Sequence, residues 1–123
     1  MNSLGLLYEK GKMVELNLTR ALEYYKQAAE KGNKKSLTSV GSFYENGWGV
    51  DQNFDLALQY YIRAAELGDS NAFNNLGYLY LHGKGVQVDI EKALQYFQSS
   101  YKIGNNRGKR NFLYIKKKLM RND

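Results

Sequence analysis

Apolar residues follow helical spacing in two consecutive stretches near the middle of the chain. In "KSLTSVGSFYENG", residues 35–47, Leu37, Gly41 and Tyr44 recur at intervals of four and three, which is the stripe of an amphipathic helix. The stretch "FDLALQYYIRAAELG", residues 54–68, shows similar spacing after a short loop. The pattern predicts two helices, here called helix A and helix B, joined by a turn.

This two-helix unit repeats every 36 residues without insertion or deletion. Sets of matching residues in this register are Gly5, Gly41 and Gly77; Tyr8, Tyr44 and Tyr80; Gly11, Gly47 and Gly83; Ala21, Ala57 and Ala93; Tyr24, Tyr60 and Tyr96; and Gly32, Gly68 and Gly104. So many matches identify a tandem repeat, the signature of a solenoid. We therefore predict an all-α fold, an α/α solenoid of helix-turn-helix repeats of 36 residues.

Polar and glycine residues mark the ends of the predicted helices. The residues just before helix B are Asn17, Asn53 and Asp89, and those at its end are Gly32, Gly68 and Gly104. A short polar side chain before a helix accepts hydrogen bonds from free backbone N–H groups. Glycine suits the left-handed residue that follows a helix end.

The register divides the chain into a partial first repeat, two full repeats and a last helix. Their ranges are 1–32, 33–68, 69–104 and, for the capping helix, 105–123. Met1 aligns with Leu37, so the chain begins inside its first helix A, and we expect a monomer or a piece of a longer array. In the last helix Leu113 replaces the repeated glycine, while Ser100 and Tyr101 replace the Ala-Ala pair of the preceding helix B. A different packing partner and a polar outer face suit a terminal cap.

The repeated unit resembles the Sel-one-like repeat, a member of the tetratricopeptide-like class of helical solenoids. The residues of the third unit that carry the resemblance are Leu76, Gly77, Tyr80, Gly83, Gly85, Val86, Asp89, Ala93, Leu94 and Tyr96. The resemblance implies a right-handed superhelix of antiparallel helix pairs that acts as an adaptor or scaffold, and it implies no catalytic residues. Two departures are tyrosine at positions 24, 60 and 96, where the family often has tryptophan, and Met13 in place of the second loop glycine of unit one. We expect neither departure to change the fold.

Charge is unevenly distributed along the chain. The net charge is +6, but the segment from Lys102 onward carries eight basic residues and one acid, Asp123, so the rest of the chain is close to neutral. The chain has no Cys, which excludes disulfides, thiolate nucleophiles and Cys-ligated metals. No apolar run approaches the roughly 18 to 20 residues of a membrane helix.

The motif "ENGWGV", residues 45–50, resembles a phosphate-binding glycine loop, but such a loop follows a strand. Here the glycines follow helix A, and the register aligns them with "LHGKGV", residues 81–86. We therefore predict that Gly47 ends helix A and Gly49 turns the chain. His82, the single histidine, has no metal-ligating or catalytic partners at workable spacing, so we expect it in a surface or groove contact.

The aromatic residues sort by register. Eight of the eleven Tyr occupy three repeating positions, which predicts that they belong to the core: Tyr8, Tyr44, Tyr80, Tyr24, Tyr60, Tyr96, Tyr25 and Tyr61. Tyr78 and Tyr114 share another repeat position, directly after the glycine of helix A. A set of residues at the same position of successive repeats is called a column here. In tetratricopeptide-like folds this column tends to face the concave groove, so these two residues are either binding contacts or incidentally exposed.

The groove columns supply the candidate site. Its predicted partner-binding residues are Asn71, Asn74, Tyr78, His82, Arg107, Arg110 and Tyr114, and the groove columns also contain Leu81, Lys117 and Lys118. Asn offers donors and acceptors to a peptide backbone, and Arg and Lys favour carboxylates. We expect a non-enzymatic module that binds a protein or peptide partner, with acidic character favoured, and that needs no cofactor.

Two other functions stay open. The basic C-terminal end could bind nucleic acid or an anionic surface in a salt-dependent manner, although its lysines could equally be the solvated face of a cap. The array could also be a structural spacer within a longer protein.

Overall fold

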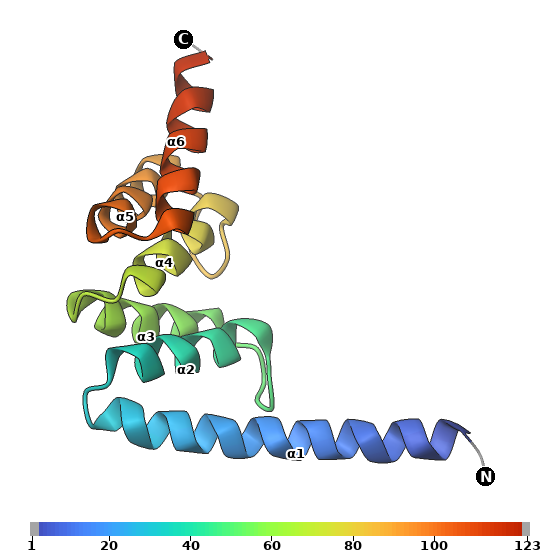
Figure 1. Cartoon of the computed structure of the whole chain (residues 1–123). Helices are drawn as coiled ribbons and strands as arrows, with labels where there is room; N and C mark the ends of the chain where they lie inside the picture. Colours follow the sequence, from blue (N-terminus) through green and yellow to red (C-terminus); the bar gives the residue numbers. More distant parts are fainter. Residues whose placement is uncertain (1–2, 122–123) are drawn as a thin grey trace.

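The computed structural model describes the backbone of residues 3–121 and the side-chain surroundings of residues 17–121. The described backbone consists of six α-helices without strands (Figure 1). Their bounds are α1 Ser3–Glu30, α2 Lys34–Asn46, α3 Phe54–Glu66, α4 Ser70–His82, α5 Ile90–Ile103 and α6 Asn106–Arg121. The predicted all-α solenoid is confirmed, with α2–α3 and α4–α5 as its helical hairpins.

The predicted helix ends of units two and three are also confirmed. Asn53 and Asp89 cap α3 and α5, where each side chain accepts a 3.0 Å hydrogen bond from a backbone N–H three residues later. Gly47 and Gly83 end α2 and α4 in the left-handed conformation, with φ of 68° and 66°. "ENGWGV" therefore forms the C-terminus of a helix followed by a turn. This is the structure that the register predicted in place of a phosphate-binding loop.

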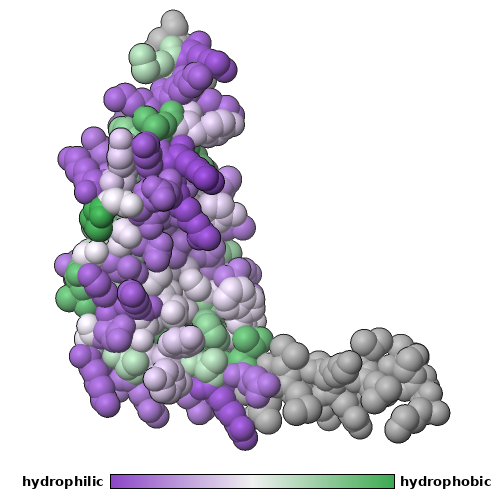
Figure 2. All heavy atoms as spheres, viewed as in Figure 1, coloured by the Kyte–Doolittle hydropathy of each residue, from purple (hydrophilic) through white to green (hydrophobic). Residues whose placement is uncertain are grey.

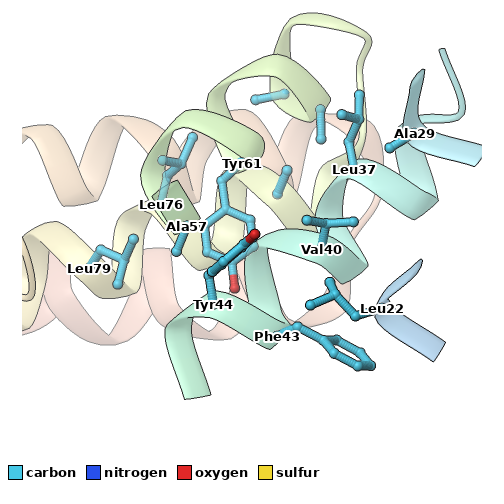
Figure 3. Packing of buried hydrophobic residues seen from close by; sticks show 13 residues of the cluster. Leu22, Ala29, Leu37, Val40, Phe43, Tyr44, Ala57, Tyr61, Leu76 and Leu79 are labelled. Carbon is cyan, nitrogen blue, oxygen red and sulfur yellow. The ribbon is translucent and has the colours of Figure 1, made fainter. Parts of the chain in front are cut away.

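Each hairpin closes through a contact between a helix A glycine and a helix B ring. A Cβ atom added to Gly41 would lie 2.6 Å from ring carbons of Tyr61, and one added to Gly77 would lie 2.6 Å from the ring of Phe97. Both rings are only 1% exposed. Figure 3 shows Tyr61 among the side chains of α2 and α3. The glycine column exists because only glycine lets the ring approach the helix backbone.

The inter-helix loops pack on the unit before them. A Cβ on Gly49 would meet the backbone of Leu18 and Thr19 at 2.8–2.9 Å, and one on Gly85 would lie 2.4 Å from Cβ of Phe54. The Thr19 hydroxyl also donates to the Gly49 carbonyl at 3.3 Å. The second loop glycine therefore serves the contact between units as well as the turn.

The first unit differs from the predicted hairpin because α1 is one continuous helix (Figure 1). By the register, the turn of unit one would fall at residues 9–14 and the helix cap at Asn17. Both predictions are wrong, since both positions lie within Ser3–Glu30. Units two and three use two glycines with positive φ in each loop, whereas Met13 replaces the second of them in unit one. A methionine rarely adopts positive φ, and it favours helix over glycine. Met13 thus changes the local fold, contrary to our expectation.

The straight α1 leaves Tyr24 outside the core. The two tyrosines that align with Tyr24 are covered within their own units. Tyr60 stacks on Tyr44 with 5.9 Å between ring centroids, and Tyr96 stacks on Tyr80 with 5.7 Å. Tyr24 is 70% exposed. The corresponding position, residue 8, lies on the same helix roughly 24 Å away at 1.5 Å per residue. The predicted core position of Tyr24 is therefore wrong, and the predicted core position of Tyr8 falls outside the residues whose side chains are described.

At the other end, the predicted change of packing partner is confirmed. Ser100 is fully buried, and its hydroxyl donates a 2.9 Å hydrogen bond to the carbonyl of Ser70. Gly108 packs against it, so closely that an added Cβ would lie 2.4 Å from the serine oxygen. Ser100 of α5 is larger than the alanine that it replaces. Gly108 of α6 is correspondingly smaller than Ala72, which holds the same register position in unit three.

We expect Gly77→Ala to destabilise the fold. The methyl group would overlap the Phe97 ring, which costs about 1–3 kcal/mol and exceeds the roughly 1 kcal/mol gained in helix propensity. Urea unfolding measures the difference. Gln95→Ala, on the exposed side of α5, controls for an alanine substitution and should change the free energy of unfolding by less than about 0.5 kcal/mol. An unchanged or higher stability of Gly77→Ala would contradict the close-contact account.

We expect Met13→Gly to break α1 and restore the turn of unit one. The glycine weakens the helix by about 1 kcal/mol and permits positive φ. Hydrogen exchange of the amides of residues 11–16 should become faster, while the Tyr24 ring should become less accessible to a quencher. Met13→Ala, which favours the helix, should leave both quantities as they are, and identical behaviour of the two variants would argue against the role of this position.

Candidate partner-binding face

Helices α4 and α6 lie side by side and run in the same direction. The Asn105 amide donates to Asn71 Oδ1 and the Asn111 amide donates to Asn74 Oδ1, both at 2.8 Å. The two helices thus meet in ascending order of residue number. We call the surface that they share the α4–α6 face; it contains Asn71, Asn74, Tyr78 and His82 of α4 and Arg107, Arg110, Tyr114, Lys117 and Lys118 of α6.

The two asparagines predicted as partner contacts are engaged within the protein. Asn74 is only 8% exposed, and its carbonyl oxygen is occupied by Asn111. Asn71 is exposed, but its carbonyl oxygen accepts from Asn105. These contacts hold α4 against α6 and thereby fix the spacing between the side chains on the face.

The remaining predicted residues are exposed on this face. Tyr78 is 42% exposed and lies 4.4 Å from the His82 ring between centroids. Tyr114 is 62% exposed, and the Lys118 amino group lies 5.2 Å from its ring centroid. Arg107 and Arg110 follow one another along α6, a helix without acidic residues. Figure 2 shows mostly hydrophilic side chains on the visible side of α6.

A hollow of about 450 Å³ opens where the C-terminal part of α4 meets α6 and the start of α5. Its lining consists of Leu81, His82, Ile90, Tyr114, Ile115, Lys118 and Leu119. A smaller hollow of about 230 Å³ adjoins it and is lined by Tyr114, Lys117, Lys118 and Arg121. The structure therefore brings His82 and Tyr114 together in one hollow, whereas Asn71, Asn74, Arg107 and Arg110 lie outside its lining.

Three apolar residues of the larger hollow were not predicted from the sequence, namely Ile90, Ile115 and Leu119. The register contained a signal for Ile90, because it aligns with Leu18 and Phe54, which the next loop covers. Among the described residues no inter-helix loop lies at the corresponding place, and Ile90 is 40% exposed.

In unit two the corresponding columns are tied to the core. The Tyr61 hydroxyl donates to the Glu45 carboxylate at 2.7 Å and lies 3.0 Å from the Ser42 hydroxyl. Burial raises the pKa of Tyr61, and the Glu45 carboxylate raises it further, against a lowering by the Ser42 hydrogen bond. Thr38, another groove column, is buried and donates to the carboxylate of Asp69. These side chains join the helices of unit two and the start of α4.

We expect the free energy of unfolding to fall as pH rises above the ordinary tyrosine pKa. The raised pKa keeps Tyr61 protonated in the folded chain, while tyrosines of the unfolded chain ionise near pH 10. The stability that this group contributes is thus complete below about pH 10 and is lost above it. Urea unfolding at neutral and at alkaline pH should show a smaller fall for Tyr61→Phe than for the unchanged protein. Tyr24→Phe controls for the loss of a hydroxyl group, and an equal fall in all three proteins would refute the assignment.

The described residues contain no group of three or more His, Asp or Glu side chains placed to hold a metal ion. None of the helices among them has the length and apolar character required to cross a membrane.

Comparison with known proteins gives a family match along most of the chain. The family model described as Sel1 repeat matches residues 1–33, 35–69 and 71–105. Among solved structures, the chain is similar to a Sel1 repeat protein from Oxalobacter formigenes, with 32% identity and a TM-score of 0.75 over 89% of this chain and 45% of that one. The match to residues 1–33 shows that the first unit keeps the repeat in sequence although α1 does not bend.

Two further structures share the fold. The chain is 28% identical to c5321, a protective antigen of uropathogenic Escherichia coli strains with an SLR fold, with a TM-score of 0.76 over 93% of this chain and 24% of that one. It is 31% identical to Helicobacter pylori cysteine rich protein B (hcpB), with a TM-score of 0.67 over 71% of this chain and 65% of that one. The chain thus spans less than two thirds of the length of each of these proteins. No curated protein matches it in sequence.

Proposed function

This chain belongs to the Sel1 repeat family, and we propose that its α4–α6 face binds a segment of a partner protein. Proteins of this family generally serve as non-catalytic scaffolds for protein interactions. The proposal assigns that general role to one surface of this chain.

The observation that carries the proposal is the row of exposed aromatic and cationic side chains along two helices fixed to one another. Tyr78 and His82 project from α4, and Arg110 and Tyr114 project from α6. Tyr and Arg are the residue types that most often dominate binding energy at protein interfaces. The amide hydrogen bonds between α4 and α6 hold these side chains in place before a partner arrives, which reduces the entropy lost on binding.

Peptides selected from a random-peptide library against the intact chain test the proposal. Isothermal titration of a selected peptide should show at least about tenfold weaker binding for Arg110→Glu and for Tyr114→Ala, as expected of interface residues that contribute more than 1.4 kcal/mol. Lys31→Glu and Tyr24→Ala are the matched controls, because both residues are exposed and belong to the α1 end of the chain. Asn74→Ala is a poor test because it breaks a buried contact. Equal affinity in the α6 variants and the controls would rule out this face.

A second function has one specific observation in its favour. Tyr114 lies among Arg110, Lys117 and Lys118 on a helix without acids, and exposed aromatics between cations suit single-stranded nucleic acid. A gel shift with single-stranded DNA should then appear at low salt and disappear at high salt. No shift at low salt would remove this alternative.

A further inference from the structure

The repeat shows what normally covers the first apolar residue of each helix B. Leu18 is covered by the loop that contains Gly49, and Phe54 by the loop that contains Gly85. The amino group of Lys84, from the same loop, lies 5.9 Å from the centroid of the Phe54 ring. In both cases the cover comes from the following unit.

Ile90 is the third member of this column, and no loop within residues 17–121 covers it. The positions that would form the next loop, Leu119 and Arg121, are part of the continuous helix α6. Ile90 is therefore 40% exposed and lines the larger hollow together with Leu81, Ile115 and Leu119. The hollow is the place that an inter-helix loop fills elsewhere in the solenoid.

The surroundings of the hollow are strongly basic. Lys118 lines both hollows, and Lys117 and Arg121 line the smaller one beside it. Two acidic residues flank Ile90 in sequence, and neither lines a hollow. Asp89 has one carboxylate oxygen engaged in capping α5, and Glu91 is exposed. Four apolar side chains next to three cations are complementary to a ligand that combines an apolar group with negative charge.

We propose that the larger hollow takes one large apolar side chain of an acidic partner segment, whose carboxylates meet Lys117, Lys118 and Arg121. This inference rests on the proposed function, because the same segment would continue along the α4–α6 face. The apolar side chain replaces the loop cover that Ile90 lacks, and burial of apolar surface supplies the affinity. The cations select the acidic segment and make binding weaker at high salt.

Three synthetic peptides test the proposal: an acidic peptide with one central leucine, the same peptide with alanine in its place, and a version with lysines for the acids. Binding is followed by NMR of the chain with labelled isoleucine and leucine methyl groups. The leucine peptide should bind about tenfold more tightly than the alanine peptide, as expected if about two of the further carbons of leucine become buried. It should shift the methyl signals of Ile90, Ile115 and Leu119, and the lysine peptide should not bind.

Two variants of the same helix provide a matched pair. Leu119→Asp places a carboxylate in the hollow and should weaken the leucine peptide about tenfold. Leu113→Asp makes the same chemical change at a residue that is 48% exposed and outside the lining, so its effect should stay below about twofold. Thermal unfolding of both variants checks that the fold is retained.

The outcomes separate this inference from the proposed function. Equal affinity of the leucine and alanine peptides, or equal effects of the two aspartate variants, overturns the occupancy of the hollow. If library-selected peptides nevertheless depend on Arg110 and Tyr114, the binding face itself stands. Concentration-dependent shifts of the Ile90 and Leu119 methyl signals without peptide would assign the hollow to a second copy of the chain and also overturn the proposal. A response of these methyl signals to single-stranded DNA but not to the acidic peptide would do the same.

Discussion

Close contact between a glycine on one helix and a ring on the next sets the geometry of each hairpin. Gly41 admits Tyr61, and Gly77 admits Phe97. The choice of ring has a consequence at the surface, because the Tyr61 hydroxyl bonds to Ser42 and Glu45, whereas Phe97 has no hydroxyl to offer. The aligned column in α4, Tyr78, is left 42% exposed. Tyr61, Ser42 and Glu45 thus form a polar contact in unit two, where the aligned residues of unit three are Phe97, Tyr78 and Leu81.

Both ends of the array show what a neighbouring unit contributes. At the first end the continuous α1 removes the stacking partner of Tyr24, which is then 70% exposed. At the last end α6 continues through the position of a loop, which leaves Ile90 uncovered beside a hollow. In a solenoid each unit buries the face of the one before it, and both residues are exposed because that cover is lacking within the described part of the chain.

The amide contacts between α4 and α6 link stability to the binding proposal. Asn74 and Asn111 are joined across the two helices, and Asn71, about one turn earlier in α4, is joined to Asn105, which directly precedes α6. Asn71 and Asn74, which the sequence predicts as groove residues, therefore hold the two helices of the α4–α6 face together. Their neighbours Tyr78, Arg110 and Tyr114 remain free to meet a partner, which divides the predicted site into residues that build the face and residues that lie exposed on it.

The sequence alone determined the period, the helix caps at Asn53 and Asp89, the glycine turns and the family, because these depend on local backbone preferences and on matches within one register. It also placed Tyr78, His82 and Tyr114 in exposed columns. It did not predict the straight α1, because the effect of one methionine depends on whether a turn gains tertiary contacts. It did not predict the buried role of Asn74 or the hollow beside Ile90 either. These were decided by tertiary structure, since burial and cover depend on which residues of the next helix lie opposite.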